Sequence, residues 1–143
     1  NILMTPLQVN QMTGIIANKG KSCRPFLLKG AGSACQSMDI QPNTIQLIKE
    51  GMKQVTETGG TAWPFFDFQV KGKRVSVAGK TGTAEFGEKT SAKGGLTHAW
   101  FTGFVPIEEP QIVVTVLLEA AGEGSYQAAP VAKELLQYWL ERQ

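Results

Sequence analysis

Consecutive strand-like segments in the second half of the chain constrain its fold more than any other feature. Residues 74 to about 85, 97–105 and 111–119 each favour a strand, and Pro-Ile-Glu-Glu-Pro at 106–110 is a hairpin connection between the last two. Strands joined by a hairpin are antiparallel. Apolar side chains fall on both faces of 97–105, and 112–118 is apolar nearly throughout. These patterns predict an antiparallel sheet that is covered on both faces.

Helices are predicted to provide that cover. Thr5, Pro6 and Gln8 have the pattern of a capped helix start, and Lys19-Gly20 is a suitable end. A second helix is predicted to be capped by Asn43, and a third to open at Pro130; their apolar stripes are Ile45, Ile48, Met52 and Val55, and Val131, Leu135, Tyr138 and Trp139. Helices followed by a run of strands argue for an α+β fold, with helices packed on both faces of the sheet. Residues 87–95 are predicted to be a loop.

Composition excludes several classes of protein. The chain has 143 residues, which is the size of one domain or part of one, and its 42% hydrophobic and 18% charged residues argue against general disorder. A formal net charge of +2 gives no reason to expect nucleic acid as a partner. The apolar run 112–118 is far shorter than the ~20 residues that a membrane span needs. Asn1-Ile2-Leu3 resembles the interior of a longer chain, so any membrane anchor is expected upstream.

The two cysteines leave two readings open. Cys23 and Cys35 are either free thiols or a disulfide that braces the loop between them, which an extracytoplasmic compartment would permit. Together with the distant His98 they do not have the ligand spacing of a zinc site. We therefore predict no metal, and His98 is given no catalytic role.

The segment that carries chemistry follows the apolar run 75–78 and reads Gly79-Lys80-Thr81-Gly82-Thr83. On a strand, Thr81 and Thr83 share one face. Two hydroxyls beside an ammonium group make a good receptor for a carboxylate. Gly82 lets a ligand or another backbone approach, and an exposed strand edge could receive a peptide as an added strand. A phosphate-binding loop is excluded in practice, since that motif needs glycine where Arg74 stands.

The context of this strand resembles the C-terminal half of the transpeptidase domain of class B penicillin-binding proteins. Lys-Thr-Gly is one of the signatures of penicillin-binding serine acyl-transferases. Further segments occur in the order that the family shows, and together they run over nearly the whole chain: Met4-Thr5-Pro6-Leu7-Gln8, Ala17-Asn18-Lys19-Gly20, Gly60-Thr61-Ala62, His98-Ala99-Trp100-Phe101, Gly103-Phe104-Val105-Pro106 and Ala128-Ala129-Pro130-Val131-Ala132. The His-Ala-Trp-Phe variant favours the elongation-type members.

The resemblance implies a fold of the penicillin-binding and serine β-lactamase type, with no cofactor. It implies that Thr81, Gly82 and Thr83 bind the carboxylate end of a peptidoglycan stem peptide or of a β-lactam antibiotic. Lys80 would support proton movement, and the backbone N–H of Thr83 would supply one arm of an oxyanion hole. The expected location is the extracytoplasmic face of the bacterial cell membrane, in cell-wall synthesis and the maintenance of cell shape.

The nucleophile that this chemistry requires is absent from the chain. The family's other signatures are Ser-x-x-Lys and Ser-x-Asn, and none of the six serines begins either one; they are Ser22, Ser33, Ser37, Ser76, Ser91 and Ser125. We therefore predict that residues 1–143 are the C-terminal portion of a single transpeptidase domain and that this chain alone forms no acyl-enzyme. As a fragment it should expose apolar surface to the missing N-terminal half, or associate with itself.

Two alternatives remain at the level of sequence. A serine β-lactamase or β-lactam sensor also has Lys-Thr-Gly, although the segments around Thr5–Gly20 and Ala128–Ala132 favour the transpeptidase. The other alternative is a non-catalytic module that binds peptides or serves as a scaffold.

Overall fold

The computed structural model describes every residue except 1, 29–31, 33 and 88–95. The loop predicted at 87–95 therefore lies almost wholly outside the described residues. The elements in chain order are α1 (Pro6–Ala17), β1 (Lys21–Cys23), β2 (Cys35–Ser37), α2 (Pro42–Thr56), η1 (Trp63–Phe65), β3 (Gln69–Val70), β4 (Lys73–Arg74), β5 (Ala78–Phe86), β6 (Leu96–Val105), β7 (Ile112–Leu118) and α3 (Ala128–Leu140).

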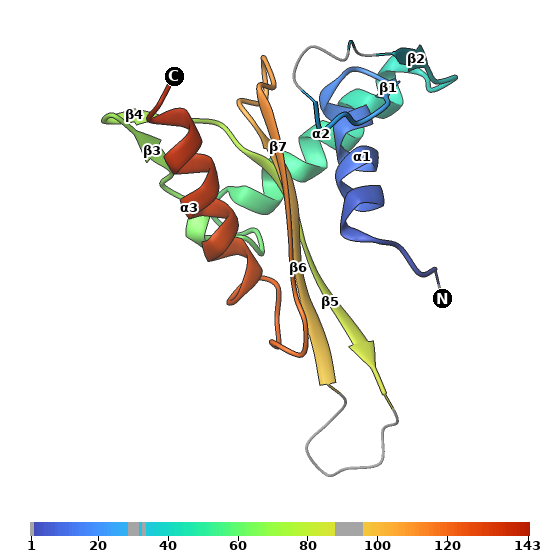
Figure 1. Cartoon of the computed structure of the whole chain (residues 1–143). Helices are drawn as coiled ribbons and strands as arrows, with labels where there is room; N and C mark the ends of the chain where they lie inside the picture. The colour runs from blue at the N-terminus through green and yellow to red at the C-terminus, as the bar shows by residue number, and fades with distance from the viewer. Residues whose placement is uncertain (1, 29–31, 33, 88–95) are drawn as a thin grey trace.

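The main sheet has three antiparallel strands in the order β5-β6-β7. Figure 1 shows the sheet nearly edge-on, with α3 on one side and α1 on the other, while α2 extends across the line of the strands. The predicted α+β fold, with helices on both faces of an antiparallel sheet, is confirmed. No helix within the described residues is long and apolar enough to cross a membrane.

Alternation along β6 divides the core between the two faces of the sheet. Phe101 and Val105 are fully buried in the cluster that includes Leu136 of α3. Phe104 points to the opposite face, where it packs with Ala17 of α1. Side chains of successive residues on a strand point to opposite faces, so the prediction that apolar side chains of 97–105 fall on both faces is confirmed.

The helix starts were predicted with mixed success. Thr5 caps α1 with the expected capping box to Gln8. The cap of α2 is Gln41 and not Asn43, because Pro42 occupies the first helical position, which suits its fixed φ and missing N–H. Helix α3 begins at Ala128, two residues before Pro130. Proline is tolerated in that first turn because the N–H groups there have no partner within the helix.

The core-facing stripe of α3 was also predicted wrongly. Its buried residues are Ala128, Ala129, Ala132 and Leu136. Val131, Leu135 and Tyr138 are exposed. Small alanines near the start of the helix allow close packing on β6 and β7. Of the predicted stripe, only Trp139 is partly buried.

A disulfide joins Cys23 and Cys35, which are directly opposite each other in the small β1–β2 sheet. Of the two readings of the cysteines, the structure therefore has the bridge. A second small sheet, β3–β4, precedes the main sheet. The strand predicted from residue 74 is divided in two, since Lys73–Arg74 pairs with β3 and the long strand β5 begins only at Ala78.

Candidate functional site

The predicted chemical residues lie in the middle of β5, which is paired on one side only within the described part of the sheet. Lys80 and Thr83 are exposed, and Thr81 and Gly82 are partly exposed. The segment is therefore accessible along a strand edge, as the sequence predicted.

The register with β6 fixes the direction of these side chains. Thr81 lies opposite Phe101, and Thr83 lies opposite Ala99. Residues directly opposite each other on antiparallel strands project to the same face. Phe101 and Ala99 belong to the cluster that packs on α3, so both threonines share that face. The prediction that Thr81 and Thr83 point the same way is confirmed.

Two hydrogen bonds involve the Lys80-Thr81 part of this segment. The Thr81 hydroxyl forms a hydrogen bond of 2.7 Å with the hydroxyl of Thr61. The ammonium group of Lys80 donates to the carbonyl oxygen of Thr81 at 2.7 Å. Sequence reasoning identified Lys80 and Thr81 but gave Thr61 no role; the only signal was its place in the Gly60-Thr61-Ala62 segment.

Glycines in β5 are required by close packing. A Cβ atom at Gly79 would lie 2.5 Å from a ring carbon of Phe101, and one at Gly82 would lie 3.1 Å from the Cβ of Trp100. Another backbone also approaches, since a Cβ at Gly124 would lie 2.4 Å from the carbonyl oxygen of Gly82. The expectation that Gly82 admits another backbone is thus confirmed for this intramolecular contact.

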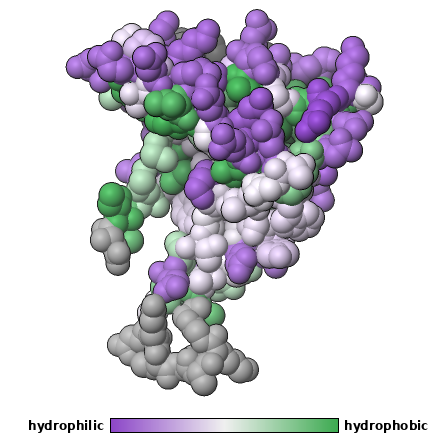
Figure 2. Space-filling model, turned by 180° about the vertical axis from the view of Figure 1, so that it is seen from behind, coloured by the Kyte–Doolittle hydropathy of each residue, from purple (hydrophilic) through white to green (hydrophobic). Residues whose placement is uncertain are grey.

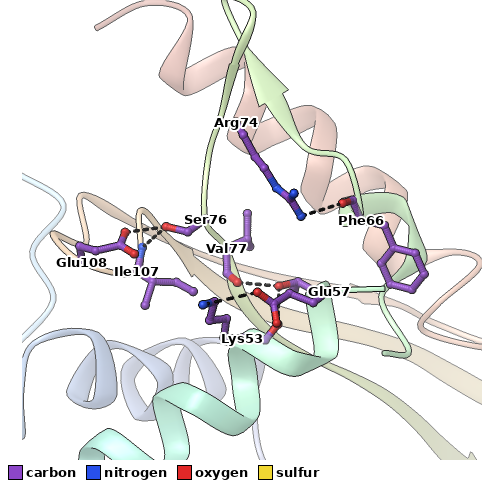
Figure 3. A network of polar contacts seen from close by, with 9 residues as sticks. Lys53, Glu57, Phe66, Arg74, Ser76, Val77, Ile107 and Glu108 are labelled. Carbon is purple, nitrogen blue, oxygen red and sulfur yellow. Dashed lines mark hydrogen bonds and ion pairs between the residues drawn. The ribbon is translucent and has the colours of Figure 1, made fainter. Parts of the chain in front are cut away.

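The start of β5 is fixed by bonds from other elements (Figure 3). Thr56, at the end of α2, donates its hydroxyl to the Val77 carbonyl at 2.6 Å. Ser76 donates to the Glu108 carboxylate at 2.6 Å and accepts from the backbone N–H of Ile107 at 3.3 Å. The β6–β7 connection and α2 therefore both hold the chain just before Lys80.

The carboxyl group of Glu108 has a pKa below its usual value. The hydrogen bond from Ser76 is the largest cause; a backbone hydrogen bond and the positive charges of Lys53 and Lys49 act in the same direction. Close by, Lys53 forms an ion pair with Glu57 at 3.4 Å, and Arg74 donates to the Phe66 carbonyl at 3.3 Å.

The far half of β5 and β6 borders a cavity of about 870 Å³ whose lining includes Trp100, His98, Phe86 and the N-terminal residues Ile2 to Met4. Figure 2 shows that strongly hydrophilic residues gather at the opposite end of the molecule. His98 stacks on Phe86 with ring centroids 4.0 Å apart, and its Nδ1 accepts from the Ala120 N–H at 3.2 Å. The ring stacking and the hydrogen bond give His98 a structural role.

The Trp63-Pro64-Phe65-Phe66 segment contributes mainly to the core. Phe65 is buried and stacks on Phe101 with a centroid separation of 5.1 Å, while Trp63 is exposed and lies against Tyr126. Among the residues that the structure describes, no three His, Cys, Asp or Glu side chains gather as metal ligands would.

Comparison with known proteins assigns the chain to a family. Residues 2–137 match the family described as the penicillin-binding protein transpeptidase domain. The chain belongs to this family, and the predicted resemblance to class B penicillin-binding proteins is confirmed.

Individual relatives agree with this assignment. The chain is 36% identical to the peptidoglycan D,D-transpeptidase MrdA of Haemophilus influenzae, with 96% of this chain and 24% of that protein covered. Its fold is similar to PBP2 of Pseudomonas aeruginosa in a complex with WCK 5153, with a TM-score of 0.75, 33% identity, and 96% of this chain and 30% of that chain covered. The imipenem acyl-enzyme of penicillin-binding protein A from M. tuberculosis also has a TM-score of 0.75, at 26% identity, with 98% and 32% covered.

The predicted penicillin-binding transpeptidase fold is therefore confirmed. The chain spans about a quarter to a third of the length of these relatives.

Proposed function

We propose that this chain is the C-terminal portion of a peptidoglycan D,D-transpeptidase domain and supplies one wall of its active site. The observation that carries the proposal is the exposed Lys80-Thr81-Gly82-Thr83 segment on a one-sided strand, with both threonine hydroxyls on one face. The names of relatives such as MrdA support the activity, and the imipenem acyl-enzyme of a relative supports β-lactam as a ligand.

Residues Lys80 to Thr83 have separate roles in binding and catalysis. The hydroxyls of Thr81 and Thr83 donate hydrogen bonds to the carboxylate of the stem peptide or β-lactam, and the charge of Lys80 attracts that anion. Gly82 has no side chain that could obstruct the ligand beside the strand. The backbone N–H of Thr83 stabilises the negative oxygen that develops when a serine attacks the substrate carbonyl. Losing one such donor typically costs about 10²–10³ in rate.

The serine itself must come from a segment that precedes this chain. Its hydroxyl gives up a proton as the oxygen forms an ester with the substrate carbonyl carbon, and the terminal D-alanine leaves as an amine after gaining that proton. A second stem peptide then attacks the ester through its amino group, which releases the serine and completes the cross-link. The positive charge of Lys80, next to the reacting groups, assists the transfer of these protons.

The missing half is the partner that the surface of the chain best fits. Large apolar side chains are exposed along the N-terminal stretch and elsewhere, among them Ile2, Leu3, Leu27 and Leu28. Neighbouring exposed apolar residues, as in the pairs Ile2–Leu3 and Leu27–Leu28, support coverage of these segments by another part of the protein. Self-association of the isolated chain is the expected substitute when that segment is missing.

The proposed location is the extracytoplasmic side of the bacterial membrane, with a role in elongation and cell shape. The Cys23–Cys35 disulfide supports an oxidising compartment. The MrdA relative, at 36% identity, supports the elongation-type assignment.

Labelling with a fluorescent penicillin tests the proposal. The chain is labelled alone and together with the longer polypeptide that contains it, and each band on a denaturing gel is identified by intact mass. We expect no label on residues 1–143 alone and label on a serine upstream of them in the longer protein. A labelled serine within this chain, or an unlabelled longer protein beside a labelled reference penicillin-binding protein, would refute the proposal. Rapid hydrolysis of a chromogenic β-lactam by the longer protein would instead indicate a β-lactamase.

A further inference from the structure

Thr61 lies next to the proposed carboxylate site although it is twenty residues away from Thr81 in the sequence. The two hydroxyl oxygens are 2.7 Å apart, and either could be the donor. This distance is typical of an O–H···O hydrogen bond. The contact therefore connects the loop after α2 to the residue proposed to hold the substrate carboxylate.

The backbone on both sides of Thr61 is fixed independently of this contact. The N–H of Gly60 donates to the Glu57 carbonyl at 2.8 Å, and the N–H of Ala62 donates to the Val55 carbonyl at 2.8 Å. Ala62 is fully buried. Since these bonds hold the loop against the last turn of α2, the Thr61 hydroxyl is presented to Thr81 by the fold and does not depend on Thr81 for its position.

The chemistry of hydroxyl groups then determines the direction of the bond when a ligand is present. A threonine hydroxyl has one proton to donate and two lone pairs that accept. A carboxylate only accepts, so Thr81 must donate its single proton to the ligand. In its contact with Thr61, Thr81 can then act only as the acceptor, and Thr61 must be the donor.

We infer that Thr61 is a positioning residue of the carboxylate site. Its hydroxyl starts a relay of two hydrogen bonds, from Thr61 to the Thr81 hydroxyl and from Thr81 to the ligand carboxylate. The inference rests on the proposed function, because it assumes that Thr81 binds the carboxylate. The bond from Thr61 occupies one lone pair of the Thr81 oxygen and thereby turns its proton towards the ligand. Successive hydrogen bonds also polarise one another, which strengthens the outer bond.

Thr61→Val tests the relay, because valine has nearly the same shape but no hydroxyl. Thr61→Ser keeps the hydroxyl, and Thr58→Val is a matched control in the same loop, where Thr58 is also exposed. The variants are made in the longer polypeptide that contains the nucleophile. The measurement is the second-order rate constant of acylation by a penicillin and by the same penicillin with its carboxylate esterified.

We expect Thr61→Val to slow acylation by the acid roughly two- to tenfold, the range that one hydrogen bond provides, and to leave acylation by the ester unchanged. Thr61→Ser should restore the rate, and Thr58→Val should have no effect. In a Thr81→Val background, Thr61→Val should cause no further loss, because the relay is already broken.

The outcomes separate this inference from the proposed function. If the unaltered longer protein is not acylated at all, the proposed function is wrong. If it is acylated, and Thr61→Val leaves the acid rate unchanged or slows the acid and ester equally, the relay is wrong while the transpeptidase assignment stands. A melting temperature of Thr61→Val close to that of Thr58→Val confirms that the effect is not one of folding.

Discussion

The loop that carries Thr61 provides a sharp test of the structure, because two glycines near it make opposite predictions for the same substitution. A Cβ atom at Gly60 would lie 2.2 Å from the carbonyl oxygen of Gln54 and 2.4 Å from that of Val55. Both atoms belong to the backbone of α2, so neither can turn away as a side chain would. Gly51, in the middle of α2, is exposed and has nothing within 4 Å of its Cβ position.

Gly60→Ala should therefore destabilise the protein, and Gly51→Ala should stabilise it. Relieving the contacts at Gly60 requires the loop and helix to separate, and inserting a methyl group into a packed site costs typically 1–3 kcal/mol. Alanine in place of glycine inside a helix gains about 0.5–1 kcal/mol, since glycine loses more conformational freedom on folding. The two variants should differ by about 1.5–4 kcal/mol in the free energy of unfolding.

Urea unfolding followed by circular dichroism, on the longer protein that contains this chain, measures both changes under identical conditions. The midpoint should move to lower urea for Gly60→Ala and to higher urea for Gly51→Ala, with the slope of the transition unchanged. A Gly60→Ala midpoint at or above that of the unaltered protein would show that the loop does not pack on the last turn of α2. The fixed presentation of the Thr61 hydroxyl would then lose its basis.

Two further perturbations address the remaining stabilising features. Reduction of the Cys23–Cys35 disulfide, or the double variant Cys23→Ser and Cys35→Ser, opens a link with a sequence separation of 12. We expect the free energy of unfolding to fall by about 2–3 kcal/mol in the chain-entropy estimate. An unfolding midpoint that does not respond to reductant would contradict the bridge. For Glu108, the pKa in the folded state lies below its ordinary value of 4.5. The stabilisation from its ionised form is therefore present above pH 4.5 and is lost as the pH falls through the lower, folded-state pKa. Glu108→Gln should abolish this part of the pH dependence, as measured by unfolding curves of the variant and the unaltered protein across the acid range. If the Ser76–Glu108 bond were absent, the stability of the two proteins would change with pH in parallel.

Local patterns predicted the parts of the fold that local physics determines. The capping box at Thr5 and Gln8 lies within one helical turn, so its residues are sufficient to specify the start of α1. The alternation along 97–105 correctly predicted apolar side chains on both faces of β6, because a strand has a fixed period of two. The shared face of Thr81 and Thr83 followed from the same period.

The errors and open questions concern features that depend on distant parts of the chain. Bridging of Cys23 and Cys35 depends on the pairing of β1 with β2, which brings the two residues opposite each other. The buried face of α3 is set by how closely the helix packs on β6 and β7, and hydrophobicity alone favoured the wrong stripe. The contact of Thr61 with Thr81 requires α2, its loop and β5 to be placed together, which no pattern within either segment could reveal.

The structure also explains how a strand can be both accessible and well positioned. Within the described residues the Lys80–Thr83 segment has β6 on one side and no strand on the other, so its backbone is open to a ligand. Such an edge would be poorly defined if only one neighbour held it. The bonds from Thr56 to Val77 and from Ser76 to Glu108 fix the chain immediately before this segment, and the packing of Gly79 on Phe101 leaves no space for a shift. Polar anchors at the start of β5 thus allow the groups that follow to meet a ligand without first being ordered, which is the condition for effective electrostatic stabilisation of a transition state.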